Sequence, residues 1–257
     1  PADMSNVQCP KCGYQRRPSD DHVLAGICPA CGIAYQKWLQ RQQRQPAEEV
    51  GTVFTREPRL STLQRVKSTI TEIPAPVDAF SFWGRGALFA LFFCWGWWFI
   101  FAGIDWTAIG GSFLHNANLP FHEFGHVLFS PFGRFMSILG GSLFQVTMPL
   151  GLMLAFILKQ RDNFAASLML WWSGQNFIDV SPYIADAPYR AIPLIGGLDE
   201  SAHDWGNLLT ITGDLDSAMT IACFSFGLGA LFIVLSYVWG GYILYLYRRA
   251  AATDGRR

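Results

Sequence analysis

The chain has 257 residues, of which 51% are hydrophobic and 15% are charged, and its formal net charge is +0. A charged fraction so far below the roughly 25% of ordinary soluble domains excludes a wholly soluble protein of average composition. The neutral balance gives no electrostatic reason to expect nucleic acid as a partner. Ordinary polar content is confined to roughly the first 75 positions, so we expect a soluble N-terminal part followed by a membrane domain.

Four cysteines near the N-terminus predict a small zinc-ribbon domain over residues 1–40. Residues 9–13 and 28–32 both read C-P-x-C-G, with 15 residues between the two pairs, which is the spacing of a tetrathiolate zinc site. A module this small needs the metal in order to fold. Two disulfides are the alternative, which a reducing cytosol disfavours. The four expected ligands are Cys9, Cys12, Cys28 and Cys31.

Residues 41–79 are expected to form a linker, because their last part is Pro-rich and extended. Residues 80–250 are expected to form the membrane domain, with residues 251–257 as a cytosolic tail. Three apolar runs in this domain are long enough to cross a bilayer, and a fourth is interrupted by polar residues. These runs are 87–104, 135–158, 219–247 and, interrupted, 164–185. We therefore predict a mostly α-helical, polytopic membrane protein with about four to five membrane segments.

Charged residues are unevenly distributed between the ends of these runs. The loop over residues 186–218 contains six acidic residues and one arginine, whereas basic residues border the other ends of the runs. Because loops rich in Lys and Arg stay in the cytosol, four spans place the ribbon and the basic ends there. The expected location is the cytoplasmic (inner) membrane of a bacterium, with the lipid bilayer as one partner. The basic residues are Arg85, Lys159, Arg161, Arg248 and Arg249.

The stretch NLPFHEFGHVLFSPFG, residues 118–133, predicts a short helix within this apolar domain. Asn118 is expected to cap the helix, Pro120 suits its first turn, and Pro131 ends it. A helix of about 11 residues is roughly 16 Å long, which is half the thickness of a bilayer core. His115 would then lie out of phase with the rest and is interpreted as structural, or as supporting the site from outside the ligand set.

Within this helix the pattern HExxH predicts a metal site. His122 and His126 are four residues apart, so both imidazoles lie on one face and can reach one ion. Glu123 is expected to be the general base that accepts a proton from water at that site. Chance occurrence, histidines that pair with carboxylates for structure alone, and haem ligation are the alternatives. Ionisable groups at membrane depth are costly and usually functional, which favours the metal site.

This HExxH, followed some tens of residues later by a membrane segment with Asn, Pro and Asp, resembles the site-2 protease family of intramembrane zinc metalloproteases. That family takes its third zinc ligand from an Asp in a pattern like N-x-x-P…DG. The comparable stretch here is GQNFIDVSPYIADAP, with Asn176, Pro182 and Asp186. Asp186 is followed by Ala187 rather than Gly, and the spacing from Asn176 to Asp186 is longer than in the family. The resemblance implies an amide at Asn176 that orients the substrate, for which an interhelical hydrogen bond is the alternative.

Zinc held by two histidines needs a third protein ligand and leaves its fourth position to water. Four residues compete for this role. Asp186 ranks first for its family-like context, His203 second because a third histidine suits zinc, and Asp179 third as a carboxylate in an apolar segment. Asp204 is the fourth candidate, and its simpler interpretation is as the cap of a helix that begins WGNLLTI.

Together these patterns predict an intramembrane zinc metalloendopeptidase that hydrolyses peptide bonds in a membrane-protein substrate. It would hold one catalytic and one structural zinc ion, and its zinc ribbon would bind a protein partner or the substrate's cytosolic tail. One alternative is a non-proteolytic metal-binding membrane protein that acts as an assembly or partner-binding factor. Another is a metal transporter, which would need several buried carboxylates and histidines along a path.

Overall fold

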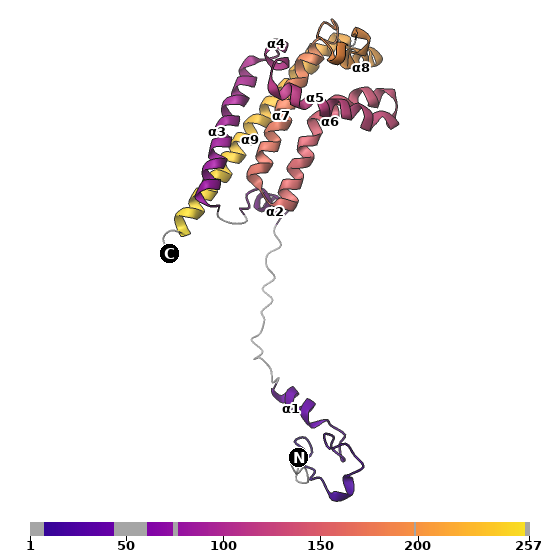
Figure 1. The fold of residues 1–257 in the computed structure, drawn as a ribbon, viewed down its shortest axis with the longest axis vertical. Coiled ribbons are helices and arrows are strands. Elements are labelled where there is room, and N and C mark those ends of the chain that lie inside the picture. Colours follow the sequence, from indigo (N-terminus) through magenta and orange to yellow (C-terminus); the bar gives the residue numbers. More distant parts are fainter. Residues whose placement is uncertain (1–7, 44–60, 74–76, 198, 255–257) are drawn as a thin grey trace. The chain divides into compact units, whose positions relative to one another are not determined.

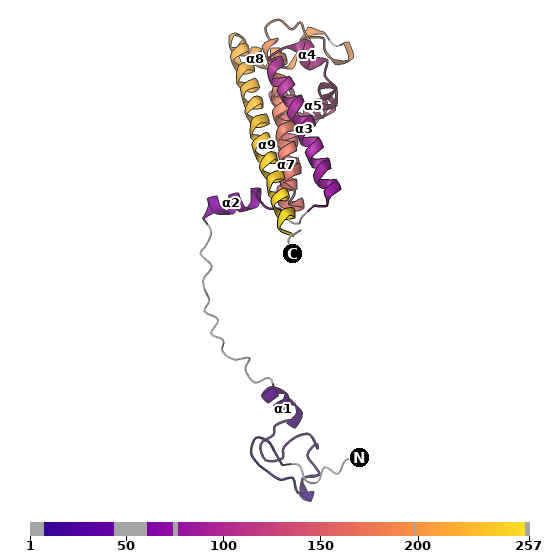
Figure 2. The same ribbon diagram turned by 90° about the vertical axis from the view of Figure 1, so that its left-hand side faces the viewer.

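The structure is a computed structural model that describes residues 8–43, 61–73, 77–197 and 199–254. The chain divides into two compact units, Pro1–Arg59 and Leu60–Arg257. The described residues are mostly helical and contain no strand, only two isolated bridges in the smaller unit. Figures 1 and 2 show the long helices of the larger unit side by side, with shorter helices at the two ends of this bundle.

The smaller unit is organised around two backbone turns, and it also contains η1 (Pro18–Asp20) and α1 (Tyr35–Gln43). Gly13 N donates to Cys9 O and Gly32 N donates to Cys28 O, both at 2.9 Å. Both glycines have a φ near +70°, a region that glycine enters without steric cost. Arg16 ties the loop between the turns by donating to four backbone carbonyls, those of Asp20, Val23, Leu24 and Ile27.

Three helices of the larger unit are long and apolar enough to cross a membrane, which indicates an integral membrane protein. They are α3 (Ala79–Ala102), α6 with its following π-helical turn η3 (Arg134–Gln160), and α9 (Ala218–Asp254). With 37 residues α9 is about 55 Å long, more than the roughly 30 Å of a bilayer core. The helix α9 is therefore longer than the hydrocarbon core of a bilayer is thick.

The helix α7 (Asn163–Ala185) corresponds to the interrupted apolar run and lies between α6 and α9 in Figure 1. Its 23 residues are long enough to span, but its polar side chains keep it out of the set of three. Fifteen of the 23 are buried, so its neighbours rather than lipid surround it. Among the described residues, length and composition thus identify three candidate spans, and α7, which corresponds to the expected fourth run, is long enough but more polar.

The core between α3, α7 and α9 is aromatic. Trp171 on α7 donates to the hydroxyl of Tyr237 on α9 at 3.3 Å, and that hydroxyl contacts Phe92 O and Phe93 O on α3 at 3.0 Å. One buried tryptophan and one tyrosine thereby connect three helices. The buried members of this core are Phe99, Ile109, Trp171, Ile178, Ile233 and Tyr237.

Glycines permit two close helix crossings. A Cβ on Gly229 of α9 would lie 2.5 Å from the carbonyl oxygen of Gly174 on α7. A Cβ on Gly140 of α6 would lie 2.6 Å from the carbonyl oxygen of Gly125 on α5. Backbones in these pairs touch directly, as small residues allow in membrane proteins.

The helix α5 (Phe113–Phe129) carries the HExxH motif and is longer than predicted. Its cap is Ser112, whose Oγ accepts from His115 N at 3.1 Å, rather than Asn118. Pro120 lies inside the helix, so 17 residues replace the expected 11. A proline removes one backbone hydrogen bond, which a helix packed on a neighbour tolerates. The consequence is that His115 shares the face of His122, contrary to the expected break in phase.

The two ends of the bundle differ in structure. One end carries α2 (Thr62–Ile70), which lies across the bundle axis in Figure 2 and is held by Asn163 Nδ2, a donor to Thr69 O and Glu72 O. This helix falls inside the expected linker 41–79, of which residues 44–60 and 74–76 lie outside the described residues. The linker therefore includes a helix that belongs to the larger unit.

The other end carries the shorter elements and the acidic loop. It is built by α4 (Trp106–Gly110), α8 (Asp204–Thr212), and the 3-10 turns η2 (Ser130–Phe132), η4 (Ile195–Gly197), η5 (Glu200–Ala202) and η6 (Leu215–Ser217). The C-terminal end of α9 and α2 lie at the opposite end (Figure 1). Which end faces the cytosol stays a prediction from the charges, and residues 255–257 of the expected tail lie outside the described residues.

The α7–α9 crossing generates a stability prediction. Gly229→Ala should lower the free energy of unfolding by about 1–3 kcal/mol, because the added methyl meets the backbone of α7. Gly227→Ala, two residues away on α9, meets nothing within 4 Å and should be neutral or stabilising by up to about 1 kcal/mol. Thermal unfolding of both variants in one detergent checks the difference. Equal melting temperatures would contradict the crossing.

Candidate metal centres

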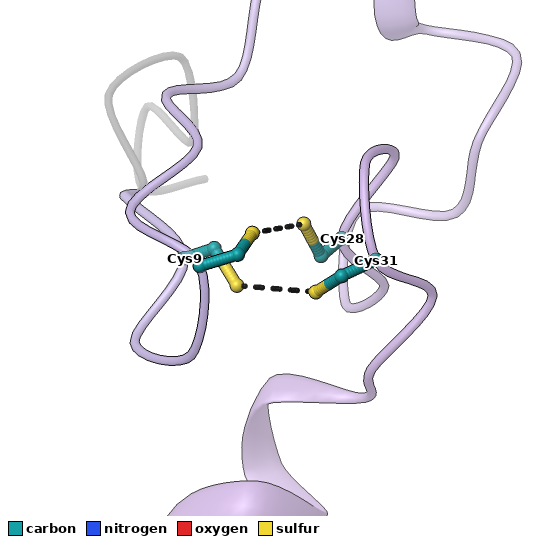
Figure 3. Close-up of side chains that lie close together, drawn as sticks. Cys9, Cys28 and Cys31 are labelled. Atoms are coloured by element: carbon teal, nitrogen blue, oxygen red, sulfur yellow. Dashed lines mark hydrogen bonds between the residues drawn. The ribbon is translucent and has the colours of Figure 1, made fainter.

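The four cysteines of the smaller unit form a compact cluster. Figure 3 shows Cys9, Cys28 and Cys31 converging, with two sulfur–sulfur contacts dashed. Cys9 Sγ lies 3.7 Å from Cys31 Sγ, and Cys12 Sγ lies 3.7 Å from Cys28 Sγ. Sulfurs around tetrahedral zinc, each about 2.3 Å from the ion, are roughly 3.8 Å apart. All four thiols are free, so the structure has the geometry of a zinc site and not of two disulfides.

A second cluster lies in the larger unit and joins His122, His126 and Asp204. Asp204 Oδ2 is 3.0 Å from His122 Nε2 and 3.3 Å from His126 Nε2. Nitrogen and oxygen ligands about 2.0–2.2 Å from a tetrahedral zinc ion are roughly 3.3 Å apart. The donor set and its spacing therefore fit a divalent metal with three protein ligands.

Both histidines are oriented by a second hydrogen bond. His122 Nδ1 lies 3.0 Å from Gln145 Oε1, and His126 Nδ1 lies 2.8 Å from Ser137 O. Since both partners accept, each Nδ1 donates, and Nε2 of each ring is the nitrogen directed at Asp204, where it can bind a metal once it carries no proton. This is the arrangement that metal-ligating histidines adopt.

Space for an ion is provided by Gly141 on α6. A Cβ at this position would lie 2.6 Å from Nε2 of His122 and 2.6 Å from Nε2 of His126. Any other residue would therefore push against both ligand atoms. The segment GGSLFQ thus contributes a glycine beside the ligands and a glutamine, Gln145, that orients one of them.

Asp204 is held in place by Tyr183 and by the start of α8. The Tyr183 hydroxyl accepts from Asp204 N at 2.9 Å and lies 3.5 Å from Asp204 Oδ2. The helix is capped by His203, whose Nδ1 accepts from Gly206 N at 3.0 Å, and not by Asp204 as its simpler interpretation had it. Asp204 is therefore free of the capping role and directs its carboxylate at the two histidines.

Asp186 and His203, which ranked above Asp204, contact each other instead of the cluster. His203 Nε2 lies 3.3 Å from Asp186 Oδ2, and that oxygen also accepts from Ile192 N at 2.9 Å. Asp186 is the C-cap of α7, and its carboxylate contacts His203 and the backbone of the loop. The carboxylate that lies beside the two histidines is that of Asp204. In the sequence, the polar pair His203–Asp204 directly before a helix is the feature that could have indicated Asp204 as a ligand.

Asp179, the third-ranked candidate, is linked to the cluster through other side chains and not directly. Its Oδ2 accepts from Gln145 Nε2 at 2.8 Å and from Asn118 Nδ2 at 3.3 Å, and its Oδ1 lies 3.1 Å from His115 Nδ1. The carboxylate is thus connected to His122 through Gln145. It can set the orientation of that glutamine, although it does not reach the ligand atoms itself.

A cavity of about 420 Å³ opens onto the cluster and is lined by His122, Glu123, His126 and Asp204. Glu123 is exposed on the cavity wall, as the HExxH spacing predicts for a base beside the ligands. Asn176 is buried on α7, does not line this cavity, and donates to Trp172 O at 3.0 Å. The structure therefore does not bring Asn176 to the position expected of a substrate-orienting amide.

The contacts between Asp204 and the two histidines shift the pKa values of Asp204 and His126. Burial disfavours the charge on Asp204, but hydrogen bonds from His122 and His126 outweigh this effect and hold the pKa of the carboxyl below its usual range. The hydrogen bond with Asp204 in turn raises the pKa of His126 to about 9 despite partial burial. A metal must displace this proton, so metal loading releases protons and weakens as the pH falls.

Comparison of the chain with protein-family models, with curated proteins and with solved structures finds no match. The features that bear on function are therefore the residues of the two clusters and the cavity.

Zinc content should depend separately on the two clusters. Purified protein should contain about two zinc ions per chain, and Cys9→Ala with Cys12→Ala should remove one of them. In that background Asp204→Ala should remove the second ion, because two ligands cannot hold zinc well. The exposed Asp216, changed to Ala in the same background, is the matched control and should retain it.

Elemental analysis after dialysis checks these contents. Zinc that persists in the Asp204→Ala variant but is lost in Asp186→Ala would reverse the assignment of the third ligand. Gln145→Leu should retain zinc with an affinity lower by about 10- to 100-fold, since it leaves His122 without its orienting partner.

Proposed function

We propose that this protein is an intramembrane zinc endopeptidase, similar in its chemistry to the site-2 protease family. One observation carries the proposal: Glu123 lies on the wall of the same cavity that the cluster of His122, His126 and Asp204 faces. A base, three ligand atoms and space for a substrate are the parts that metal-assisted hydrolysis requires.

The metal would be held by His122 Nε2, His126 Nε2 and a carboxylate oxygen of Asp204. Zinc in such a site supplies a Lewis acid that polarises a carbonyl and lowers the pKa of water to about 7. The protein keeps the ligand atoms fixed through Gln145, the Ser137 carbonyl and Tyr183. This rigid support keeps the ligands in one arrangement, so no binding energy is needed to reorganise them.

Glu123 would move the proton. Its carboxylate accepts a proton from the attacking water and delivers it to the amine that leaves when the peptide bond breaks. Its position directly after His122 places it one residue from a ligand, on the exposed side of α5.

The substrate class follows from the cavity. Apolar side chains from the loop before α8 cover one side, namely Ile192, Pro193 and Leu194. The three helices long enough to span a membrane place this cavity in a membrane protein. An apolar segment of another membrane protein, locally unwound so that a peptide bond is accessible, suits such a lining. The cysteine cluster would form the structural zinc ribbon and bind a partner or the substrate's cytosolic tail.

A non-proteolytic role for the same metal site is the second candidate. It is favoured by the position of Asn176, which donates to Trp172 O and does not line the cavity where the protease pattern expects an amide. In that case the cavity would bind a partner segment without cleaving it.

Glu123→Gln separates the two functions. The substitution preserves size and hydrogen bonding but removes the base, so zinc content should be unchanged while cleavage falls by about 100-fold or more. The measurement is proteolysis of a panel of single-span proteins reconstituted with the enzyme, alongside zinc analysis. His126→Ala is the companion variant and should lose both zinc and activity. If cleavage by Glu123→Gln does not differ from that of the wild type, Glu123 is not the base, and the non-proteolytic binding function remains as the explanation of the site.

A further inference from the structure

The cavity extends along α5 well beyond the metal ligands. The residues of this helix that line it are His115, Asn116, Leu119, His122, Glu123 and His126. Their spacing of i, i+1, i+4, i+7, i+8 and i+11 defines one continuous face of the helix. Eleven residues at 1.5 Å each make this face about 16 Å long. The metal cluster occupies one part of it, and His115 lies toward the other end.

His115 is fixed in orientation by a buried carboxylate. Its Nδ1 lies 3.1 Å from Asp179 Oδ1, and the side chain of Asp179 is only 2% exposed. The ring of Trp106 packs edge-on against the imidazole with centroids 5.1 Å apart. Because Nδ1 engages Asp179, the other ring nitrogen, Nε2, is on the far side of the ring, and the His115 side chain remains 17% exposed on the cavity wall.

The protonation of His115 determines what Nε2 can bind. Burial alone would lower the pKa of this imidazole, but the hydrogen bond and charge of Asp179 outweigh burial and raise it. The other titratable groups on the cavity wall are Asp179, Glu123, Tyr183 and the three metal ligands. A protonated ring that donates from Nδ1 to Asp179 has its second N–H, at Nε2, available as a donor.

We infer that His115 is a substrate-binding subsite, whose Nε2–H donates to an acceptor side chain about three residues from the bond that is cleaved. The spacing follows from two lengths. His115 precedes His122 by seven residues, or about 10.5 Å of helix. An extended peptide advances about 3.3 Å per residue, so the same length spans about three residues. The preferred side chains at that position carry a carbonyl, hydroxyl or carboxylate oxygen. This inference depends on the proposed function, because it assumes an extended peptide beside the metal.

Peptidyl hydroxamates test the subsite by binding rather than turnover. The probes are a minimal hydroxamate and two peptide hydroxamates that are identical except for Gln or Leu at the third residue from the chelating group. One series carries the peptide on the amino side and a second series carries it on the carboxyl side. Dissociation constants are measured by calorimetry on the full-length, zinc-loaded protein and on the variants His115→Phe and His115→Gln.

In the wild type, one series should bind the Gln peptide about tenfold or more tightly than the Leu peptide. The ratio should fall to about one in His115→Phe and be partly retained in His115→Gln, which keeps a donor. The minimal hydroxamate should bind all three proteins equally, which shows that the variants fold and hold zinc. A ratio unchanged in His115→Phe, or near one in the wild type for both series, overturns the subsite alone. Failure of every hydroxamate to bind the zinc-loaded wild type overturns the proposed function together with the subsite.

Discussion

The crossing of α5 over α6 at Gly125 and Gly140 is the contact on which the candidate membrane metal site depends. With no side chain between the two backbones, the HExxH helix lies directly on α6. This proximity brings the Ser137 carbonyl to His126 and the Gln145 amide to His122. The same approach requires glycine at Gly141, where any side chain would occupy the space in front of both imidazoles. One backbone carbonyl and one side chain of α6 thus orient the ligands on α5.

The second determinant is the need to pair polar groups inside an apolar bundle, where water is not available to solvate them. Asp179 collects donors from three residues, and Asp204 lies against two histidines and one tyrosine. These contacts explain why α7 is more polar than its neighbours. Asp179 and Tyr183 of α7 take part in these contacts, and α7 is buried by protein where α3 and α9 expose apolar surface.

Much of this organisation could be predicted from the sequence. The two C-P-x-C-G turns predicted the four-cysteine cluster because short-range spacing determines where the sulfurs lie. The apolar runs predicted the three spanning helices, and the i, i+4 spacing of His122 and His126 predicted their common face. Each of these features depends on residues that are close in the chain.

Features that depend on distant residues were not accessible in the same way. Asp204 is 78 residues from His126, and only the folding of α7 and α8 brings it to the histidines instead of Asp186. The start of α5 was predicted too late because Pro120 was interpreted as a first-turn residue, whereas the helix begins at Phe113 and continues through Pro120. Asn176 does not line the cavity although it was expected at the site, whereas His115 does line it, since the phase of each helix about its axis decides which residues face the cavity.

X-ray absorption at the zinc edge tests the central claim most directly, namely that His122, His126 and Asp204 hold a metal ion in the membrane domain. The sample is the full-length protein with Cys9→Ala, Cys12→Ala, Cys28→Ala and Cys31→Ala, which leaves only this site. The account predicts one zinc per chain with about four nitrogen or oxygen neighbours at roughly 2.0–2.2 Å, two of them imidazoles, and no sulfur shell. A protein that takes up no zinc, or a sulfur neighbour near 2.3 Å, would contradict it.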